Sequence, residues 1–149
     1  MSMKGKNALV TGSTSGIGLA MARAFAAEGA NVMLNGLGDL KEIEATRAAI
    51  EADFGVKALY NGANMLKPDE IRALVAEAEA AFGGIDILVN NAGIQFVSPV
   101  EEFPVEKWDA VLAINLSSAF HTTRLALPRM RERNNLPTGN VPRRFRIEC

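Results

Sequence analysis

Residues 11–18 have the sequence TGSTSGIG, and this stretch decides the fold. It follows a short apolar run at 7–11 and precedes an alanine-rich segment at 16–28 whose apolar residues recur at helical spacing. A glycine-rich turn from a strand into a helix is typical of a phosphate-binding loop, because the first amides of the helix are free donors with a partial positive charge. The alternative is a glycine and serine turn that binds nothing.

Each glycine of this loop has a specific use in dinucleotide binding. Gly12 permits the tight turn off the strand, Gly16 lets the backbone approach a pyrophosphate, and Gly18 lets the helix pack close to the sheet. The Thr14 and Ser15 hydroxyls can add hydrogen bonds. The cofactor-binding residues that we expect here are Gly12, Thr14, Ser15, Gly16, Ile17 and Gly18.

Strand-like and helix-like segments alternate along the rest of the chain. Expected strands lie at 7–11, 31–35, 56–60 and 85–89, and expected helices lie at 16–28, 40–54, 68–82 and about 105–133. Pro128 is expected to kink the last helix or to end it early. Four alternating strand–helix units predict an α/β fold with a doubly wound parallel sheet of the Rossmann type. We assign 1–133 to this domain, as its N-terminal part only.

Composition excludes several classes of protein. The 149 residues carry a net charge of −1 and are 48% hydrophobic, so no basic surface for nucleic acid or an acidic membrane is indicated. No apolar run is long enough to span a membrane, and no apolar signal region precedes the first strand. The only cysteine is Cys149, which precludes an internal disulfide, and we identify no metal site. A cytoplasmic protein is the default expectation.

Three motifs in order carry a resemblance to a known family. They are the TGxxxGIG loop, the NNAG sequence at 90–93 and Asn115 within the INLS sequence at 114–117. Over about residues 4–130 the chain resembles the short-chain dehydrogenase/reductase family, which implies hydride transfer between a nicotinamide cofactor and a substrate. The resemblance implies that Asn91, Ala92 and Gly93 line the ribose region; the alternative is a turn stabilised by asparagine side chains.

The resemblance also gives Asn115 a catalytic role. The matching asparagine in the family helps to bend the long helix and to hold a water molecule in the proton relay. The alternative is an ordinary core amide whose hydrogen bonds are satisfied.

NAD is the expected cofactor. A carboxylate near the end of the second strand selects NAD, whereas an arginine favours NADP. Residues 35–39 are NGLGD, with no basic residue and with Asp39 slightly late, and Leu37 is the expected contact in this loop. The family usually has an aspartate near the adenine after the third strand. This chain has Asn64 followed by Met65, and an amide oxygen can still pair with the adenine amino group.

The substrate is also inferred by resemblance. Segments 34–39, 91–95 and 103–109 are similar to those of family members that oxidise 3-hydroxybutyrate, in which a glutamine matching Gln95 binds the substrate carboxylate. A small hydroxy or keto acid is therefore the implied substrate. On the sequence alone, an exposed loop residue is the better interpretation of Gln95, and another substrate within the family stays open.

The proton-transfer residues of the family have no match here. In the family a serine and a Tyr-x-x-x-Lys pair do this work, but the only tyrosine is Tyr60, with no lysine four residues later. We therefore expect negligible dehydrogenase activity. The apolar residues of 134–149 do not recur at the spacing of a helix or a strand. We interpret this segment as an out-of-frame or truncated end; a genuine short tail is the alternative.

The segments of the family that have no match in this sequence also bear on assembly. The family's homo-oligomer would lack one interface helix here, and the fourth strand would become an apolar edge. The second hypothesis is a non-catalytic nucleotide-binding or docking module that associates with a full-length relative.

Overall fold

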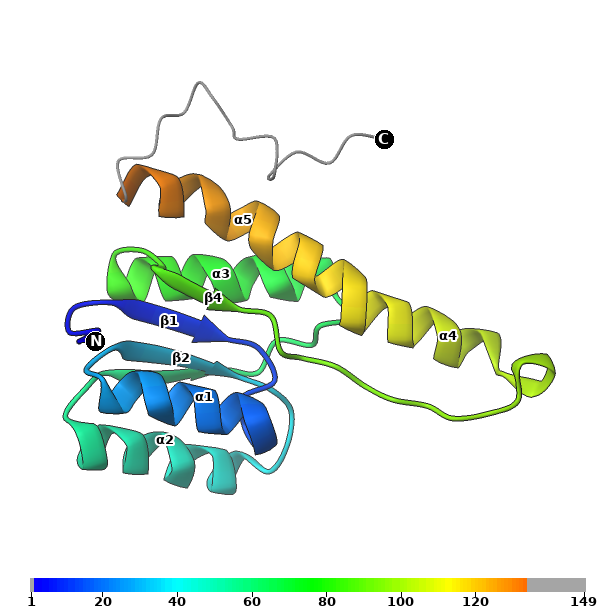
Figure 1. The fold of residues 1–149 in the computed structure, drawn as a ribbon, viewed down its shortest axis with the longest axis horizontal. Coiled ribbons are helices and arrows are strands. Elements are labelled where there is room, and N and C mark those ends of the chain that lie inside the picture. The colour runs from blue at the N-terminus through cyan, green and yellow to red at the C-terminus, as the bar shows by residue number, and fades with distance from the viewer. Residues whose placement is uncertain (1, 134–149) are drawn as a thin grey trace.

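Residues 2–133 are described by the structure, a computed structural model, and the interpretation of 134–149 as an irregular tail lies outside them. The parallel sheet has the strand order β3-β2-β1-β4 (Figure 1). The strands are β1 (Asn7–Val10), β2 (Asn31–Asn35), β3 (Ala58–Asn61) and β4 (Ile87–Val89). This order is the N-terminal part of the expected doubly wound sheet, with the reversal point between β1 and β4. Within 2–133, β4 is an edge strand.

Helices cover both faces of the sheet (Figure 1). On one face lie α1 (Gly16–Ala27) and α2 (Leu40–Phe54), and on the other lie α3 (Pro68–Phe82) and α5 (Ser118–Arg133). A short 3-10 turn, η1 (Val100–Glu102), precedes α4 (Val105–Leu112). A π-helical turn, η2 (Ala113–Ser117), joins α4 to α5 without a break in the helix.

The alternation of side chains along β1 and β2 divides the apolar interior into two cores. Val10 and Leu34 face α1 and α2, whereas Leu9 and Met33 face α3 and α5, and all four are fully buried. Successive side chains of a strand point to opposite faces, so a strand covered on both sides must be apolar throughout. This explains why these strands appear as continuous apolar runs in the sequence.

Local signals place the helix ends. Asp39 caps α2 by accepting hydrogen bonds from the amides of Lys41 (2.9 Å) and Glu42 (3.1 Å). Gly55 ends α2 in the left-handed conformation, with φ 66°. Pro68 occupies the first turn of α3, where its missing N–H costs nothing.

The long helix differs from its prediction at Pro128. The expected early end is wrong, because α5 continues past this residue to Arg133. Pro128 removes one backbone hydrogen bond, but the helix is held on either side of it. Ala126 is fully buried in the core, and the Arg133 guanidinium is 3.0 Å from the buried Asp86 carboxylate.

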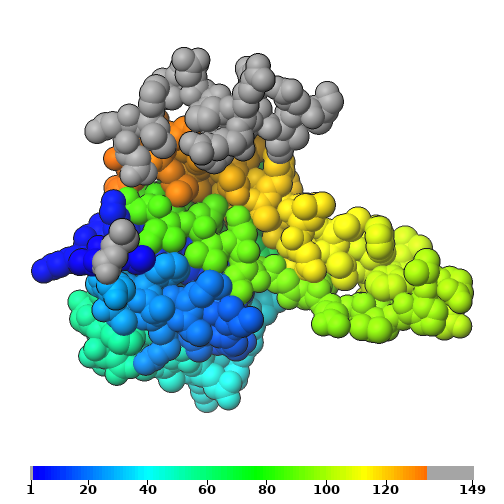
Figure 2. Space-filling view, viewed as in Figure 1, coloured from blue at the N-terminus to red at the C-terminus, as the bar shows by residue number. Residues whose placement is uncertain are grey.

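Residues 94–112 extend away from the sheet, and we call this segment the arm (Figures 1 and 2). It contains three aromatic side chains in edge-to-face contact, with Phe103 between Phe96 and Trp108. Within 2–133, no helix is long and apolar enough to cross a membrane. The same residues contain no group of three or more histidine, cysteine, aspartate or glutamate side chains placed to hold a metal ion.

Candidate functional site

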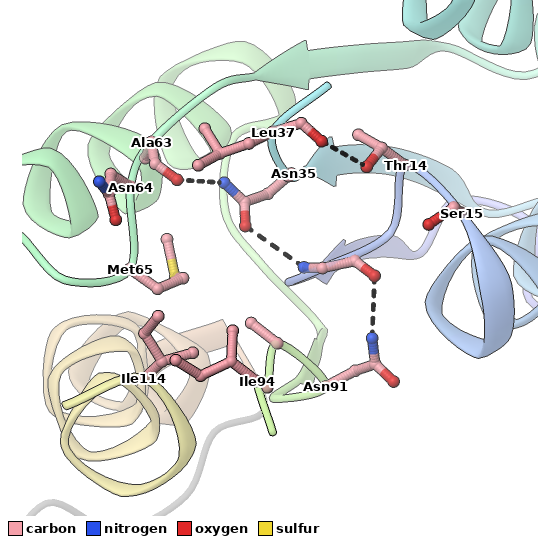
Figure 3. A pocket seen from close by; sticks show the side chains of 14 residues that line it. Thr14, Ser15, Asn35, Leu37, Ala63, Asn64, Met65, Asn91, Ile94 and Ile114 are labelled. Carbon is pink, nitrogen blue, oxygen red and sulfur yellow. Dashed lines mark hydrogen bonds between the residues drawn. The ribbon is translucent and has the colours of Figure 1, made fainter. Parts of the chain in front are cut away.

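A cavity of about 350 Å³ lies at the carboxyl edge of the sheet, where all four strands end (Figure 3). This is the position at which sheets of this topology bind ligands. Its walls come from five segments: Gly12, Thr14 and Ser15; Asn35, Gly36 and Leu37; Ala63, Asn64 and Met65; Asn91, Ala92, Gly93 and Ile94; and Ile114.

The glycine loop forms one wall, and its glycines meet different demands. A Cβ at Gly12 would be 2.8 Å from the Cα of Ala92, so only glycine fits there. Gly16 has φ +56°, and a Cβ added at this position would have no atom within 4 Å, so its backbone faces open space. The N-cap of α1, Ser15, makes no side-chain capping bond, and the first turn of α1 has no acidic residue. Free helix amides beside an accessible glycine backbone fit a phosphate group.

The segment after β4 is bound to the glycine loop. The Asn91 side-chain amide donates to the carbonyl oxygens of Thr11 (3.0 Å) and Gly12 (2.9 Å). In return, the Thr11 hydroxyl accepts from the backbone amides of Asn91 and Ala92, both at 3.0 Å. The expected asparagine-stabilised turn is therefore present. It also places Ala92 and Gly93 in the cavity wall, while their contact with a ribose stays a prediction.

Asn35, at the end of β2, was not among the expected site residues, yet its side chain is central. It is fully buried, accepts from the Gly12 amide (3.3 Å), and donates to the carbonyls of Asn61 (3.1 Å) and Ala63 (3.0 Å). An amide directly after the apolar residues 32–34 of β2 was the signal in the sequence. Without the fold, nothing indicated which backbone groups would meet it.

The loop after β2 forms the rim. Leu37 is 66% exposed at the mouth of the cavity. The Tyr60 hydroxyl donates to the Gly36 carbonyl (2.8 Å), so the only tyrosine of the chain supports this loop. A second hollow of about 290 Å³ adjoins the rim, and the charged residues in its lining are both acidic, Asp39 and Glu42.

The loop after β3 lines the cavity with Ala63, Asn64 and Met65, where the resemblance implies that an adenine would lie. The Asn64 side-chain oxygen accepts from the Leu66 backbone amide (2.9 Å), and the Asn64 backbone amide donates to the Glu70 carboxylate (2.8 Å). Lys67 forms an ion pair with Glu70 at 2.8 Å. This ion pair, and then the Asn64 amide, hold the pKa of Glu70 below its ordinary value. The loop is therefore anchored by a charged carboxylate.

Asn115 lies in the π-helical turn and not in the cavity wall. Its side chain exchanges two hydrogen bonds with the backbone of Ile94: the Ile94 amide donates to it (2.8 Å), and its own amide donates to the Ile94 carbonyl (2.9 Å). The residue is exposed, which differs from the expected buried position, while its neighbour Ile114 lines the cavity. The π-helical turn stands at the position where the resemblance implies a bend of the helix, and turns of this kind commonly bend helices.

Most of the expected site residues meet at one cavity, and a few do not. Nine of them line it: Gly12, Thr14, Ser15, Leu37, Asn64, Met65, Asn91, Ala92 and Gly93. Gly16, Ile17 and Gly18 begin α1 beside it, and Gln95 is an exposed arm residue outside the lining. The residues that sequence reasoning missed are Asn35, Gly36, Ala63, Ile94 and Ile114.

Comparison with known proteins agrees with this geometry. The short chain dehydrogenase family model matches residues 6–139. Among curated proteins, the D-beta-hydroxybutyrate dehydrogenase of Cupriavidus necator is 56% identical over 132 residues, which are 89% of this chain and 50% of that protein. The protein of the same name from Rhizobium meliloti is 51% identical over 128 residues, 86% of this chain and 50% of that protein.

A solved structure has the same fold. The L-sorbose reductase of Gluconobacter frateurii, complexed with NADPH and L-sorbose, superposes with a TM-score of 0.85 at 36% identity. That match covers 89% of this chain and 50% of the reductase. The chain thus spans about half the length of the relatives it matches. From its sheet topology, its glycine loop and these matches, the chain belongs to the short-chain dehydrogenase/reductase family.

Proposed function

We propose that this chain carries the NAD-binding part of a 3-hydroxybutyrate dehydrogenase-type oxidoreductase. The observation that carries the proposal is the glycine loop, where the open backbone of Gly16 and the uncapped start of α1 adjoin the cavity. Residues 1–133 would form this nucleotide-binding unit.

The cofactor would lie across the carboxyl edge of the sheet. Its pyrophosphate would face Gly12–Gly18, its adenine would lie by Asn64 and Met65, and its nicotinamide ribose would lie by Asn91–Gly93. Bound there, the nicotinamide supplies hydride chemistry. This chain's own residues would bind the dinucleotide and orient it. Asn115 would position the segment after β4 through Ile94.

NAD is favoured over NADP by the charge at the rim. Asp39 and Glu42 are the charged residues that line the hollow beside Leu37, and carboxylates there repel a 2′-phosphate. The solved relatives include proteins complexed with NADPH or NADP. Titration of this chain with NAD and with NADP distinguishes the two.

The substrate proposal is a small hydroxy acid, 3-hydroxybutyrate, with Gln95 contacting its carboxylate. It is supported by the identity of 56% and 51% to two D-beta-hydroxybutyrate dehydrogenases. For the 149-residue chain itself we propose negligible turnover. Tyr60, its only tyrosine, donates its hydroxyl to the Gly36 carbonyl and has Asn64, not lysine, four residues later. Loss of a general acid/base costs about 100- to 10,000-fold.

A second candidate is a non-catalytic module that docks on a full-length relative. It is favoured by the edge position that β4 has among residues 2–133 and by the exposed apolar side chains of the helix running from α4 into α5, among them Trp108, Leu116 and Phe120. Co-elution of the purified chain with such a relative would support it.

A thermal melt of the 149-residue chain with excess NAD, NADP or neither tests the main proposal. Because a ligand that binds only the native state stabilises it, the melting temperature should rise with NAD and less with NADP. No response to either nucleotide would contradict the proposal. Absorbance at 340 nm with 3-hydroxybutyrate and NAD tests turnover, and a sustained rise would contradict the proposed inactivity.

A further inference from the structure

We propose that Asn35 is a positioning residue that sets the spacing between the phosphate end and the adenine end of the crevice. The inference rests on the proposed dinucleotide function and deepens it. Asn35 begins the 35–39 segment from which the cofactor choice was inferred, but no contact was assigned to it from the sequence. Its side chain lies between the two loops that would hold opposite ends of an adenosine diphosphate group (Figure 3).

The contacts of Asn35 are divided between those two loops. Its Oδ1 accepts from the Gly12 amide on the glycine loop at 3.3 Å. Its Nδ2 donates to the Asn61 carbonyl (3.1 Å) and the Ala63 carbonyl (3.0 Å). These carbonyls lie where β3 leads into residues 62–67, which we call the adenine loop because the adenine is proposed to lie there. The backbone of Asn35 is paired with Ser13, since the Ser13 amide donates to the Asn35 carbonyl and the Asn35 amide donates to the Ser13 hydroxyl.

Only an amide satisfies this arrangement. The position needs one acceptor toward Gly12 and two donors toward Asn61 and Ala63, which matches the groups of an asparagine side chain. The side chain is fully buried, so each unmet group would cost the free energy of its desolvation. An aspartate of the same shape keeps the acceptor but turns a second oxygen toward two carbonyl oxygens. A leucine or an alanine provides neither kind of group.

The expected consequence depends on how far a ligand reaches. Adenosine would contact the adenine loop alone, so its binding does not depend on the distance between the adenine loop and the glycine loop. ADP and NAD extend from the adenine loop to the glycine loop, so their binding depends on the spacing that Asn35 sets. A residue with only a structural role would change the affinity for all three ligands by the same factor.

The test is the Asn35→Asp variant of the full chain, with adenosine, ADP and NAD titrated at a temperature where the variant is folded. We expect ADP and NAD affinity to fall about tenfold or more and adenosine affinity to fall less than about threefold. The matched control is Asn61→Ala. It removes a side-chain acceptor of the Ala63 amide (2.9 Å) within the adenine loop, and it should lower affinity for all three ligands by one factor.

The outcomes separate this inference from the function on which it rests. If the unaltered chain binds none of the three ligands, the proposed function fails. If it binds them and Asn35→Asp lowers their affinities equally, or not at all, the positioning role is overturned.

If Asn35→Asp does not fold, Asn35→Ala replaces it, and a spectroscopic measurement on the unaltered chain gives an independent answer. Adenosine should then shift the amide resonance of Gly12, across Asn35, in the nuclear magnetic resonance spectrum. An unmoved Gly12 resonance at saturating adenosine overturns the proposal.

Discussion

The Cα of Gly18 lies against the carbonyl oxygen of Gly12. A Cβ at Gly18 would be 2.2 Å from that oxygen and 2.5 Å from the side-chain nitrogen of Asn91. The same Asn91 nitrogen donates to the Gly12 carbonyl at 2.9 Å. Helix α1, the glycine loop and the segment after β4 therefore meet at one point, and no side chain larger than hydrogen fits between them.

Gly18→Ala should destabilise the fold. Because the atoms it would meet are backbone and a hydrogen-bonded amide, the methyl group must displace the loop, and overpacking of this kind costs about 1–3 kcal/mol. Urea unfolding measures the loss. An unchanged midpoint would show that α1 can shift away from the loop without cost.

Gly16→Ala should weaken NAD binding with little loss of stability. Its φ of +56° is left-handed and its Cβ would meet nothing within 4 Å, so the conformational cost is about 1 kcal/mol. The methyl group would stand where the pyrophosphate is expected. Gly55→Ala is the matched control, because Gly55 has φ +66° and open space but ends α2, outside the cavity lining.

Both alanine variants should lower the free energy of unfolding by similar amounts, while only Gly16→Ala should lose NAD affinity, by about tenfold or more. Calorimetric titration with NAD measures the difference. Equal NAD affinity in the two variants would argue against a phosphate at Gly16.

Asn115→Ala should loosen the segment after β4. Two hydrogen bonds to the Ile94 backbone are lost, and at about 1 kcal/mol each for an exposed site, the expected destabilisation is about 1–2 kcal/mol. Asn115→Asp is the matched variant, since it keeps the acceptor for the Ile94 amide but replaces the donor by a second oxygen that faces the Ile94 carbonyl. Amide hydrogen exchange at Ile94 should accelerate in the alanine variant and much less in the aspartate variant. Equal exchange in both would mean that the Ile94 amide does not depend on this acceptor.

The sequence was sufficient to predict the elements of this fold, and insufficient for the contacts between them. Helices α2 and α3 begin and end as expected, because Asp39, Pro68, Gly55 and Gly83 are strong local end signals. The early end expected at Pro128 does not occur, since the helix is held on either side of this residue by core packing at Ala126 and by the ion pair of Arg133.

At the candidate site, too, the sequence predicted local motifs but not the contacts between distant segments. The glycine and NNAG motifs predicted six of the fourteen lining residues, and the loops after the second and third strands predicted three more. Asn35 and Tyr60 were missed as supporting residues because their partners are backbone groups 23 to 28 residues away in the chain, Gly12, Asn61, Ala63 and Gly36. No local pattern reports a backbone group brought near by the pairing of β1, β2 and β3.

The Glu70 carboxyl should titrate below the ordinary glutamate range. The ion pair with Lys67 is the main cause, the Asn64 amide is the second, and both favour the charged form. Since the folded pKa is lowered, any stability from this group is present above the unfolded pKa and is lost as the pH falls through the folded pKa. The loop after β3 should therefore loosen only under acidic conditions.

Carbon-detected resonance of the Glu70 carboxyl group against pH measures its pKa directly. In Lys67→Met the pKa should rise but stay below the ordinary value, because the Asn64 amide still donates to the carboxylate. A Glu70 pKa unchanged by Lys67→Met would show that the ion pair does not form in solution.

Removal of the two rim carboxylates should raise affinity for NADP. Asp39 both caps α2 and lines the hollow beside Leu37, so Asp39→Ala would also cost about 1 kcal/mol of stability through the lost cap. Asp39→Ser keeps a capping oxygen and removes the charge, and Glu42→Gln removes the second charge with its shape kept. In the double variant, less repulsion of the 2′-phosphate should strengthen NADP binding by about fivefold to tenfold at low salt and leave NAD binding nearly unchanged.

Salt dependence tests whether the gain in NADP affinity is electrostatic, because salt screens exposed charges. The gain for NADP should shrink as ionic strength rises, and Asp53→Asn, a neutralised carboxylate near the far end of α2, should give no gain. An equal gain in NADP affinity from Asp53→Asn would mean that the net charge of the protein, and not the rim carboxylates, controls NADP binding. No gain in the double variant would mean that Leu37 and Gly36 exclude the 2′-phosphate by their position, and that the preference for NAD is set by the shape of the rim.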